Sequence, residues 1–481
     1  MTLDDDACYS ALASRDCRLD GVFFVGVTTT GVYCRPVCPA RTPGRSRCVF
    51  FGSAAHAERA GFRACFRCRP ELAPGSAPVD AVPQLVRAAL RKIDAGALNE
   101  QSVEELARSL GVSERHLHRA LVDALGLSPV ELAQTQRLAL AKRLLHDSSL
   151  GMTEIALAAG FGSVRRFNSA FRGRFGKPPS ALRRGPESSA AGAGSVRLRL
   201  DYRPPLAFTS HLGFLAARAL PGVEFVEGER YRRVVRIGDR TGWLSVERDP
   251  TRPALSAEVS LSLADKLPAV VAGLRRLFDL DAKPEEIDRR LVRDPRLSRY
   301  VKRTPGRRVP GAFDGFETAV RAVLGQQVSV KGATTVAGRL VERFGPRVET
   351  PFPELRRVFP SSGVLARARV SELAALGMPG ARARALMELA RAVEAGLELS
   401  PGAALEPTLR ALGELPGFGD WTTQYVAMRT LSWPDAFPAT DLGVQKALGT
   451  KSKAAALALA EAWRPWRAYA TLHLWAEGAS P

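Results

Sequence analysis

The sequence predicts a multidomain α+β protein with four folded modules, and three observations lead to this fold class. First, 481 residues are too many for one ordinary domain. Second, all seven cysteines lie within the first 68 residues, which indicates a small separate module. Third, strand-like alternation of apolar and charged residues is confined to 196–263, whereas the pattern from 266 onward is helical.

Two stretches rich in small residues and proline divide the chain: "APGSAP" at 73–78 and "GPESSAAGAGS" at 185–195. Between and beyond them, "VRLRLDY", "YRRVVRI", "GWLSVER" and "ALSAEVSLSL" are typical of strands. We therefore expect a small α/β domain, an all-α domain, a flexible linker, an α+β lobe and a helical lobe, with these boundaries: 1–75, 80–184, 185–195, 196–280 and 281–481.

The chain is strongly basic, with 69 Lys and Arg against 49 Asp and Glu and a formal net charge of +20. The excess is +3 in 1–75, +5 in 76–190 and +12 in 191–481, so no single tail accounts for it. A charge spread over every module indicates a polyanionic partner, either nucleic acid or an acidic membrane surface. The sequence has no long uncharged apolar run, and "MTLDDDACYS" is not typical of a signal peptide. We expect a cytoplasmic, monomeric protein without a membrane partner.

Four of the cysteines form two closely spaced pairs. Three residues separate Cys34 from Cys38, and two separate Cys65 from Cys68. These spacings suit four thiolates around one tetrahedral Zn²⁺, and in a cytosolic protein clustered cysteines favour metal binding over disulfides. The alternative, four buried thiols without a metal, is disfavoured by two such pairs. The other three are expected to be small core residues: Cys8, Cys17 and Cys48.

The stretches "DGVFFVGVTTTGVYCRPVCPAR" and "AGFRACFRCRPELAPG" resemble the zinc domain of the Ada family of methylation-damage sensors over nearly all of residues 1–75. The resemblance implies that Cys34 accepts one methyl group from a methylphosphotriester in DNA. A zinc-held thiolate is the nucleophilic form of cysteine, and its methylation would remove one negative charge that repels phosphate. The arginines expected to hold the DNA backbone are Arg35, Arg41, Arg45, Arg47, Arg67 and Arg69.

Residues 102–125 predict a helix, a turn and a second helix. Ser102 and Glu105 match a capping box at the start of the first helix. Arg115 and Arg119 lie on the polar face of the second, toward solvent or DNA.

The pattern recurs at 152–184, where "GFGS" precedes a helix whose inner stripe is Val164, Phe167, Phe171 and Phe175. Arg165 and Arg166 point away from that stripe, and a basic face of this kind favours docking in the major groove. "GFGSVRRFNSAFRGRFGKPPSALR" resembles the AraC family over about 80–184. The resemblance implies two recognition helices that bind double-stranded promoter DNA, and it makes RNA polymerase a further expected partner.

"LPGFGDWTTQYVAM" at 415–428 predicts two helices joined by a tight turn. Gly417 and Gly419 permit a hairpin whose backbone N–H groups face a DNA phosphate. With "FPATDLGVQKAL" after it, the stretch resembles the helix-hairpin-helix superfamily of base-excision glycosylases, and the resemblance makes Asp441 the catalytic carboxylate. The resemblance narrows to the AlkA type of glycosylase over about 196–481 because of two further stretches, "FETAVRAVLGQQVSVKGATTVAGRL" and "YATLHLWAEG".

This type removes alkylated bases such as 3-methyladenine after flipping them from the duplex. The resemblance places Trp421, Tyr425 and Trp475 around the base pocket, against the alternative that each is a core residue. It gives Gln327 the position that can wedge into the gap left by the flipped base. Lyase members carry a lysine where this chain has Trp421, so we expect a monofunctional enzyme that uses water.

The sequence therefore predicts one chain that accepts methyl groups, binds promoters and excises bases. No cysteine follows Cys68, so the second transferase domain typical of Ada proteins, with its P-C-H-R site, is absent. The alternative is a transcription regulator in which zinc is structural and the glycosylase fold only holds DNA.

Overall fold

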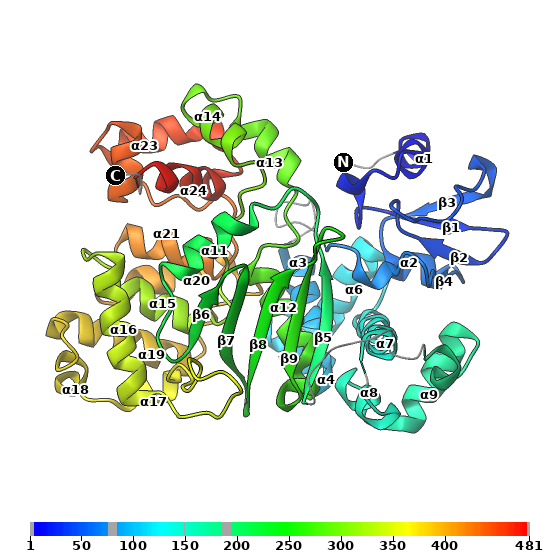
Figure 1. Cartoon of the computed structure of the whole chain (residues 1–481), viewed down its shortest axis with the longest axis horizontal. Coiled ribbons are helices and arrows are strands. Elements are labelled where there is room, and N and C mark those ends of the chain that lie inside the picture. Colours follow the sequence, from blue (N-terminus) through cyan, green and yellow to red (C-terminus); the bar gives the residue numbers. More distant parts are fainter. Residues whose placement is uncertain (1–3, 76–83, 149, 184–193, 479–481) are drawn as a thin grey trace. The chain divides into compact units, whose positions relative to one another are not determined.

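The fold is described from a computed structural model that covers residues 4–75, 84–148, 150–183 and 194–478 (Figure 1). The linkers predicted at 73–78 and 185–195 lie largely outside the described residues. The chain divides into two compact units. Unit 1 comprises Met1–Pro204, Asp249–Ala272 and Leu280–Ala282. Unit 2 comprises Pro205–Arg248, Gly273–Asp279 and Lys283–Pro481.

Unit 1 begins with a four-stranded sheet in the order β3-β1-β2-β4. Strand β2 pairs antiparallel with β1 and parallel with β4, with Tyr33 opposite Ala64. This register brings the next residues, Cys34 and Cys65, to the same edge of the sheet. The elements of this module are α1 (Asp5–Ala13), η1 (Cys17–Leu19), β1 (Phe24–Val27), β2 (Val32–Cys34), η2 (Arg45–Arg47), β3 (Cys48–Phe51), α2 (Ala54–Arg59), β4 (Arg63–Ala64) and η3 (Pro70–Leu72).

The core of this module is small and includes two of the three remaining cysteines. One cluster of buried side chains consists of Cys8, Ala11, Leu12, Phe23, Val25 and Cys48, and Phe24, Tyr33, Ala57 and Leu72 are buried as well. The prediction that Cys8 and Cys48 are core residues is confirmed. The same prediction is wrong for Cys17, which is only half-buried because it begins the surface helix η1.

The second module of unit 1 is helical, as predicted. Backbone and side-chain hydrogen bonds between Ser102 and Glu105 form the expected capping box. Phe167, Phe171 and Phe175 are buried, which confirms most of the predicted inner stripe, while Val164 is half-buried. The helices are α3 (Gln84–Asp94), α4 (Ala97–Glu100), α5 (Val103–Ser109), α6 (Glu114–Leu125), α7 (Pro129–Asp147), α8 (Met152–Ala158), α9 (Val164–Phe175) and α10 (Pro179–Leu182).

A buried ion-pair network joins α7 to the cysteine module within unit 1. The Lys142 ammonium is 1% exposed and donates to Glu71 Oε2 at 2.9 Å and to the Cys65 carbonyl at 3.2 Å. Arg69 donates to both carboxylate oxygens of Asp147, at 2.6 and 2.8 Å. Burial alone would raise the pKa of Glu71, but Lys142 and Arg69 lower it below its usual value. The loop that carries the second cysteine pair therefore packs against α7, the long helix of the helical module.

The four predicted strand segments are confirmed. In unit 1, β5 (Ser195–Asp201) pairs antiparallel with β9 (Ala254–Ser260). In unit 2, β6 (Glu224–Glu227), β7 (Arg230–Ile237) and β8 (Arg240–Arg248) form an antiparallel meander preceded by α11 (Phe208–Ala216).

From η4 (Leu261–Lys266) onward the chain is helical, as predicted. The core of the helical lobe packs α15, α16, α19 and α21 around apolar side chains such as Val320, Leu386 and Val426. Within the described residues, no helix is long and apolar enough to cross a membrane. The helices are α12 (Leu267–Leu277), α13 (Pro284–Leu291), α14 (Pro295–Arg303), α15 (Gly315–Leu324), α16 (Val330–Phe344), α17 (Ser362–Arg367), α18 (Val370–Ala374), α19 (Gly380–Glu394), α20 (Leu405–Glu414), α21 (Asp420–Arg429), α22 (Leu442–Leu448), α23 (Lys453–Ala460), η5 (Glu461–Trp463) and α24 (Arg467–Gly478).

Candidate functional sites

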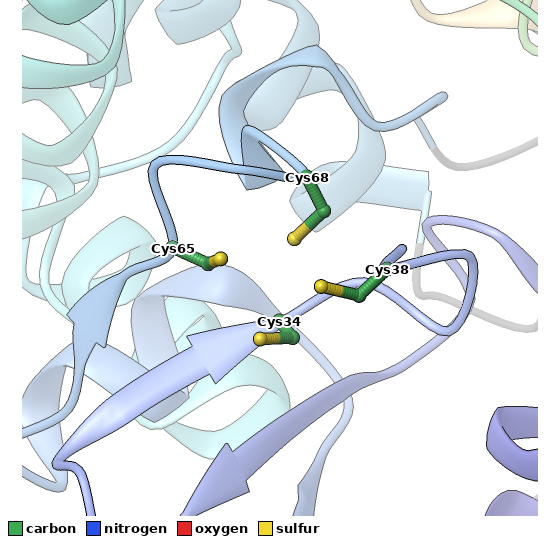
Figure 2. A group of neighbouring side chains, drawn as sticks. All are labelled: Cys34, Cys38, Cys65 and Cys68. Carbon is green, nitrogen blue, oxygen red and sulfur yellow. The ribbon is translucent and has the colours of Figure 1, made fainter. Parts of the chain in front are cut away.

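The four paired cysteines converge on one point in unit 1. Figure 2 shows the sulfurs of Cys34, Cys38, Cys65 and Cys68 pointing toward a common centre. Their Sγ atoms all lie within 4.8 Å of one another, and none forms a disulfide. Strand pairing between β2 and β4 supplies one cysteine of each pair, and the following turns supply the other.

The four sulfurs differ in their backbone hydrogen bonds. The Arg67 amide donates to Cys65 Sγ at 3.4 Å, and the Arg35 amide donates to Cys68 Sγ at 3.3 Å. The Ala40 amide donates to Cys38. Among the described residues, no backbone N–H donates to Cys34 Sγ.

The cluster fits a divalent cation of the zinc type. Hydrogen bonds with Cys38 and Cys65 raise the pKa of the Cys34 thiol, while hydrogen bonds with Cys34 and Cys38 lower the pKa of the Cys65 thiol. Sulfurs this close cannot all ionise without a positive charge between them. Four thiolate donors at one point are the ligand set of a structural zinc. The cluster is therefore a zinc site, as predicted.

Removal of the zinc is expected to unfold the cysteine module. The module comprises only residues 4–75, and a domain of this size buries little apolar surface, so metal binding must supply much of its folding free energy. We expect a chelator to release one zinc ion per chain and to make residues 4–75 sensitive to limited proteolysis. The cavity of unit 2 described below shares no residue with this module, so base release should persist. A chelated module that stays protease-resistant would contradict this expectation.

The structure corrects one predicted DNA contact. Arg35 is 5% exposed, and its guanidinium donates to Asp20 Oδ1 at 2.8 Å and to Asp201 Oδ2 at 2.8 Å. A side chain held by two buried carboxylates is not available to a phosphate. The expectation that Arg35 contacts DNA is therefore wrong for this conformation; its guanidinium instead also donates to the Cys68 carbonyl at 3.2 Å.

A cavity of about 390 Å³ opens beside the sulfurs. Cys34, Cys38 and Cys65 line it, together with the predicted arginines Arg41 and Arg67. Arg63 also lines it, and it is not predicted from the sequence. A cavity with thiol sulfurs on one wall and guanidinium groups around it suits a phosphate ester.

Of the other predicted arginines of the module, Arg45 and Arg69 are engaged in ion pairs. Arg45 lies on the surface and pairs with Asp5 and Asp6 at 3.3 and 3.1 Å, and exposed pairs of this kind are weak enough to exchange for DNA. Arg69 belongs to the buried network on α7. Arg47 is exposed.

The predicted recognition helices carry their arginines on the outside. α6 and α9 are each capped by a serine and end at a glycine with positive φ. Arg115 and Arg119 on α6 are exposed, as are Arg165 and Arg166 on α9. The structure thus leaves all four guanidinium groups accessible to a nucleic acid.

Unit 2 holds a cavity of about 1270 Å³ with Asp441 in its wall. Asp441 caps α22 by accepting from the Val444 amide at 2.9 Å. Its carboxylate also accepts from two indole N–H groups, Trp421 Nε1 on Oδ2 and Trp475 Nε1 on Oδ1, both at 2.8 Å. A Cβ atom at Gly443 would lie 3.2 Å from both Asp441 Oδ1 and the Trp475 ring, so glycine keeps room for this contact. Three donors therefore fix the direction of one carboxylate.

The predicted aromatic residues lie together on the same cavity. Trp421 stacks on Tyr425 with ring centroids 5.2 Å apart, and Tyr425 lies 6.1 Å from Trp475. All three rings line the cavity and are only half-buried. This placement favours the pocket over the core for Trp421 and Trp475, whereas Tyr425 lines the cavity and also packs against the apolar core of the helical lobe.

The deep wall of the cavity contains residues that the sequence did not reveal. Phe214 of α11 lies nearly parallel to Trp475, and the guanidinium of Arg218 sits 3.8 Å from the Phe214 ring centroid. Arg429 donates to Tyr425 Oη at 2.6 Å. Burial raises the pKa of Tyr425, but Arg429, Arg218 and Arg321 together lower it below its usual value. The stretch "LGFLAARAL" that supplies two of these side chains resembles an ordinary apolar helix, so no local pattern predicts them.

The predicted hairpin and wedge residues meet at the opening of this cavity. Gly417 adopts φ +79°, which permits the turn between α20 and α21, whereas Gly419 is extended and is the N-cap of α21. Gln326 Nε2 donates to the Gly417 carbonyl at 2.7 Å, which ties the loop after α15 to the hairpin. Gln327 is exposed, adopts φ +55° and lines the cavity.

Comparison with known protein families defines the class of protein. The metal binding domain of Ada matches residues 7–71, and a helix-turn-helix domain matches 106–185. The AlkA N-terminal domain matches 197–314, and the HhH-GPD superfamily base excision DNA repair protein matches 320–457. Together they define a multidomain protein of DNA repair and regulation.

Whole-chain similarity identifies the family. A probable bifunctional transcriptional activator/DNA repair enzyme AlkA from Mycobacterium tuberculosis is 43% identical over 98% of this chain and 96% of its own length. The chain belongs to this family of bifunctional activator/repair proteins. DNA-3-methyladenine glycosylase 2 of Escherichia coli is 37% identical over 59% of this chain and 98% of its own length. A solved 3-methyladenine DNA glycosylase from Archaeoglobus fulgidus shares the fold, with a TM-score of 0.53, 23% identity, and coverage of 58% of this chain and 98% of its own.

Proposed function

We propose that this protein senses methylated DNA with its zinc module, binds promoter DNA with its helix-turn-helix module and excises alkylated bases with unit 2. The module boundaries proposed are those predicted from the sequence. Double-stranded DNA is the partner supported by the families matched, and we add RNA polymerase as partner, a monomeric state and a cytoplasmic location to the proposal.

For base excision, the observation that carries the proposal is Asp441 between two indole donors in an aromatic cavity. A purine methylated on a ring nitrogen is cationic and stacks well on aromatic rings. As its bond to C1′ breaks, positive charge grows on the sugar, and a fixed carboxylate stabilises it. Water adds to C1′, so the products are the free base and an abasic site.

The residue before Thr422 supports a monofunctional reaction. Trp421 occupies the position where a lysine would form a Schiff base, and its indole N–H is engaged with Asp441. A tryptophan cannot form a covalent bond to C1′, so the strand stays intact after base release.

The test is incubation of the full chain with DNA that contains 3-methyladenine, followed by measurement of the free base and of strand cleavage. We expect catalytic release of the base without a strand break. Absence of base release would instead support a regulator whose glycosylase fold only holds DNA.

Two observations support methyl transfer by Cys34. The other three sulfurs accept backbone hydrogen bonds, which lower the nucleophilicity of a sulfur, and an arginine-lined cavity opens beside Cys34. When bound, zinc keeps the Cys34 sulfur as a thiolate at neutral pH. The thiolate attacks the methyl carbon of the phosphotriester, a sulfur–carbon bond forms, and the phosphodiester anion leaves. A thioether is a poor leaving group, so each molecule reacts once.

Substitution of Trp475 by Phe is expected to lower base release about ten- to a hundredfold. The variant keeps an aromatic ring in the cavity but removes one of the N–H donors that orient Asp441. Single-turnover rates of Trp475→Phe and Trp421→Phe should fall to a similar extent, because each loses one donor. A Trp475→Phe rate equal to wild type would show that the ring, and not its N–H group, is what the site uses.

A further inference from the structure

The exposed apolar side chains of unit 2 gather at one place. Three large apolar residues of this unit are exposed among the described residues: Val328 at 43%, Val330 at 42% and Leu442 at 81%. All three line the cavity that contains Asp441. Isolated exposed apolar side chains are common, but their confinement to the rim of one cavity points to an apolar partner at that rim.

Leu442 has the most direct position on this rim. It follows Asp441 in the chain and is the first residue of α22, whose start is fixed by the Asp441 cap. A carboxylate that faces C1′ of the target nucleotide places the next side chain against the same stretch of DNA. Under the proposed base excision, Leu442 therefore faces the strand at the point where the base leaves the stack.

Val328 lies on a loop that the structure holds firmly, and Val330 is the first residue of α16, which follows this loop. Gln326 Nε2 donates to Gly417 O and to Thr422 Oγ1 at 2.7 and 2.8 Å, and Arg382 donates to the Gln326 carbonyl at 2.6 Å. The side chain of Ser329 caps α16. This loop is thus a fixed support on the same cavity as Leu442.

Gln327, which the sequence resemblance places in the gap left by the flipped nucleotide, suits that gap less well than an apolar side chain does. Gln327 has a polar amide, which loses its hydration without a matching partner when it enters a stack of base pairs. An apolar side chain gains from the same transfer, and apolar wedges are what proteins insert at unstacked steps.

We propose that Leu442, with Val328 and Val330 beside it, packs into the space that the flipped nucleotide leaves in the duplex and holds the base in the cavity. This positioning role rests on the proposed base excision. In this proposal Gln327 contributes little to filling the gap in the duplex.

The experiment compares single-turnover release of 3-methyladenine from duplex DNA and from single-stranded DNA of the same sequence, with the full chain. A gap exists only in the duplex, so the ratio of the two rates isolates the role of the rim. We expect Leu442→Ser to lower this ratio about ten- to a hundredfold, the range given by the burial of one leucine. Leu442→Met should restore most of it, since the volume and apolar character are kept.

Two further variants complete the test. Leu157→Ser changes a 53% exposed leucine of α8 in unit 1 and should leave the ratio at its wild-type value. Gln327→Ala should lower the ratio less than Leu442→Ser does. An unchanged ratio in Leu442→Ser, or a larger effect of Gln327→Ala, would overturn the proposal. Wild-type protein that releases no base from either DNA would instead reject the proposed function itself.

Discussion

Asp441→Asn is expected to lower the rate of 3-methyladenine release about a thousandfold. The change removes the negative charge that faces the sugar. It also places an NH₂ group opposite one of the two indole N–H donors, because Trp421 and Trp475 each bond a different oxygen of the carboxylate. Asparagine is a good helix N-cap, so α22 should keep its start and the variant its fold. Single-turnover base release measures the effect.

Asp420→Asn is the matched control for this prediction. Asp420 begins α21 next to Trp421 but pairs with Lys453 and does not line the cavity. Its substitution should leave base release close to wild type. A rate for Asp441→Asn within a few-fold of wild type would show that the carboxylate is only a helix cap.

Methylation of Cys34 is expected to raise the affinity of the full chain for DNA about tenfold at low salt. The reason is electrostatic, since one negative charge disappears next to the phosphate cavity lined by Arg41, Arg63 and Arg67. The gain should shrink as salt rises, because ions screen exposed charges. Titration of fluorescent DNA with unmethylated and methylated protein measures it.

Cys34→Ser is the control for the affinity change, because it cannot form the thioether. Exposure to methylphosphotriester DNA should leave its affinity unchanged. Equal affinities of wild-type protein before and after methylation would reject the electrostatic switch while leaving base excision untouched.

The parts of both sites that are encoded locally could be predicted from the sequence. Each closely spaced cysteine pair supplies two zinc ligands. The pairing of Tyr33 with Ala64 on two short strands is enough to bring the two cysteine pairs together. Asp441 follows its hairpin within one stretch of chain, and the aromatic residues at 421 and 425 are on the hairpin's second helix.

The parts that depend on distant partners could not be predicted. Arg35 is in a motif that suggests DNA contact, but Asp20 and Asp201 bury it. Phe214 joins the cavity from α11, in a stretch whose composition is that of a core helix. The exposure of Leu442 likewise depends on how α22 is placed against the cavity, which residue types alone do not determine.

Mass spectrometry of the zinc-loaded chain after exposure to DNA with a methylphosphotriester tests the central claim, that a metal-held sulfur removes the methyl group. Peptide mapping should find one added methyl group per chain, on Cys34, with the zinc still bound. A methyl group on Cys38, Cys65 or Cys68 instead, or no modification of a fully metallated protein, would contradict the account.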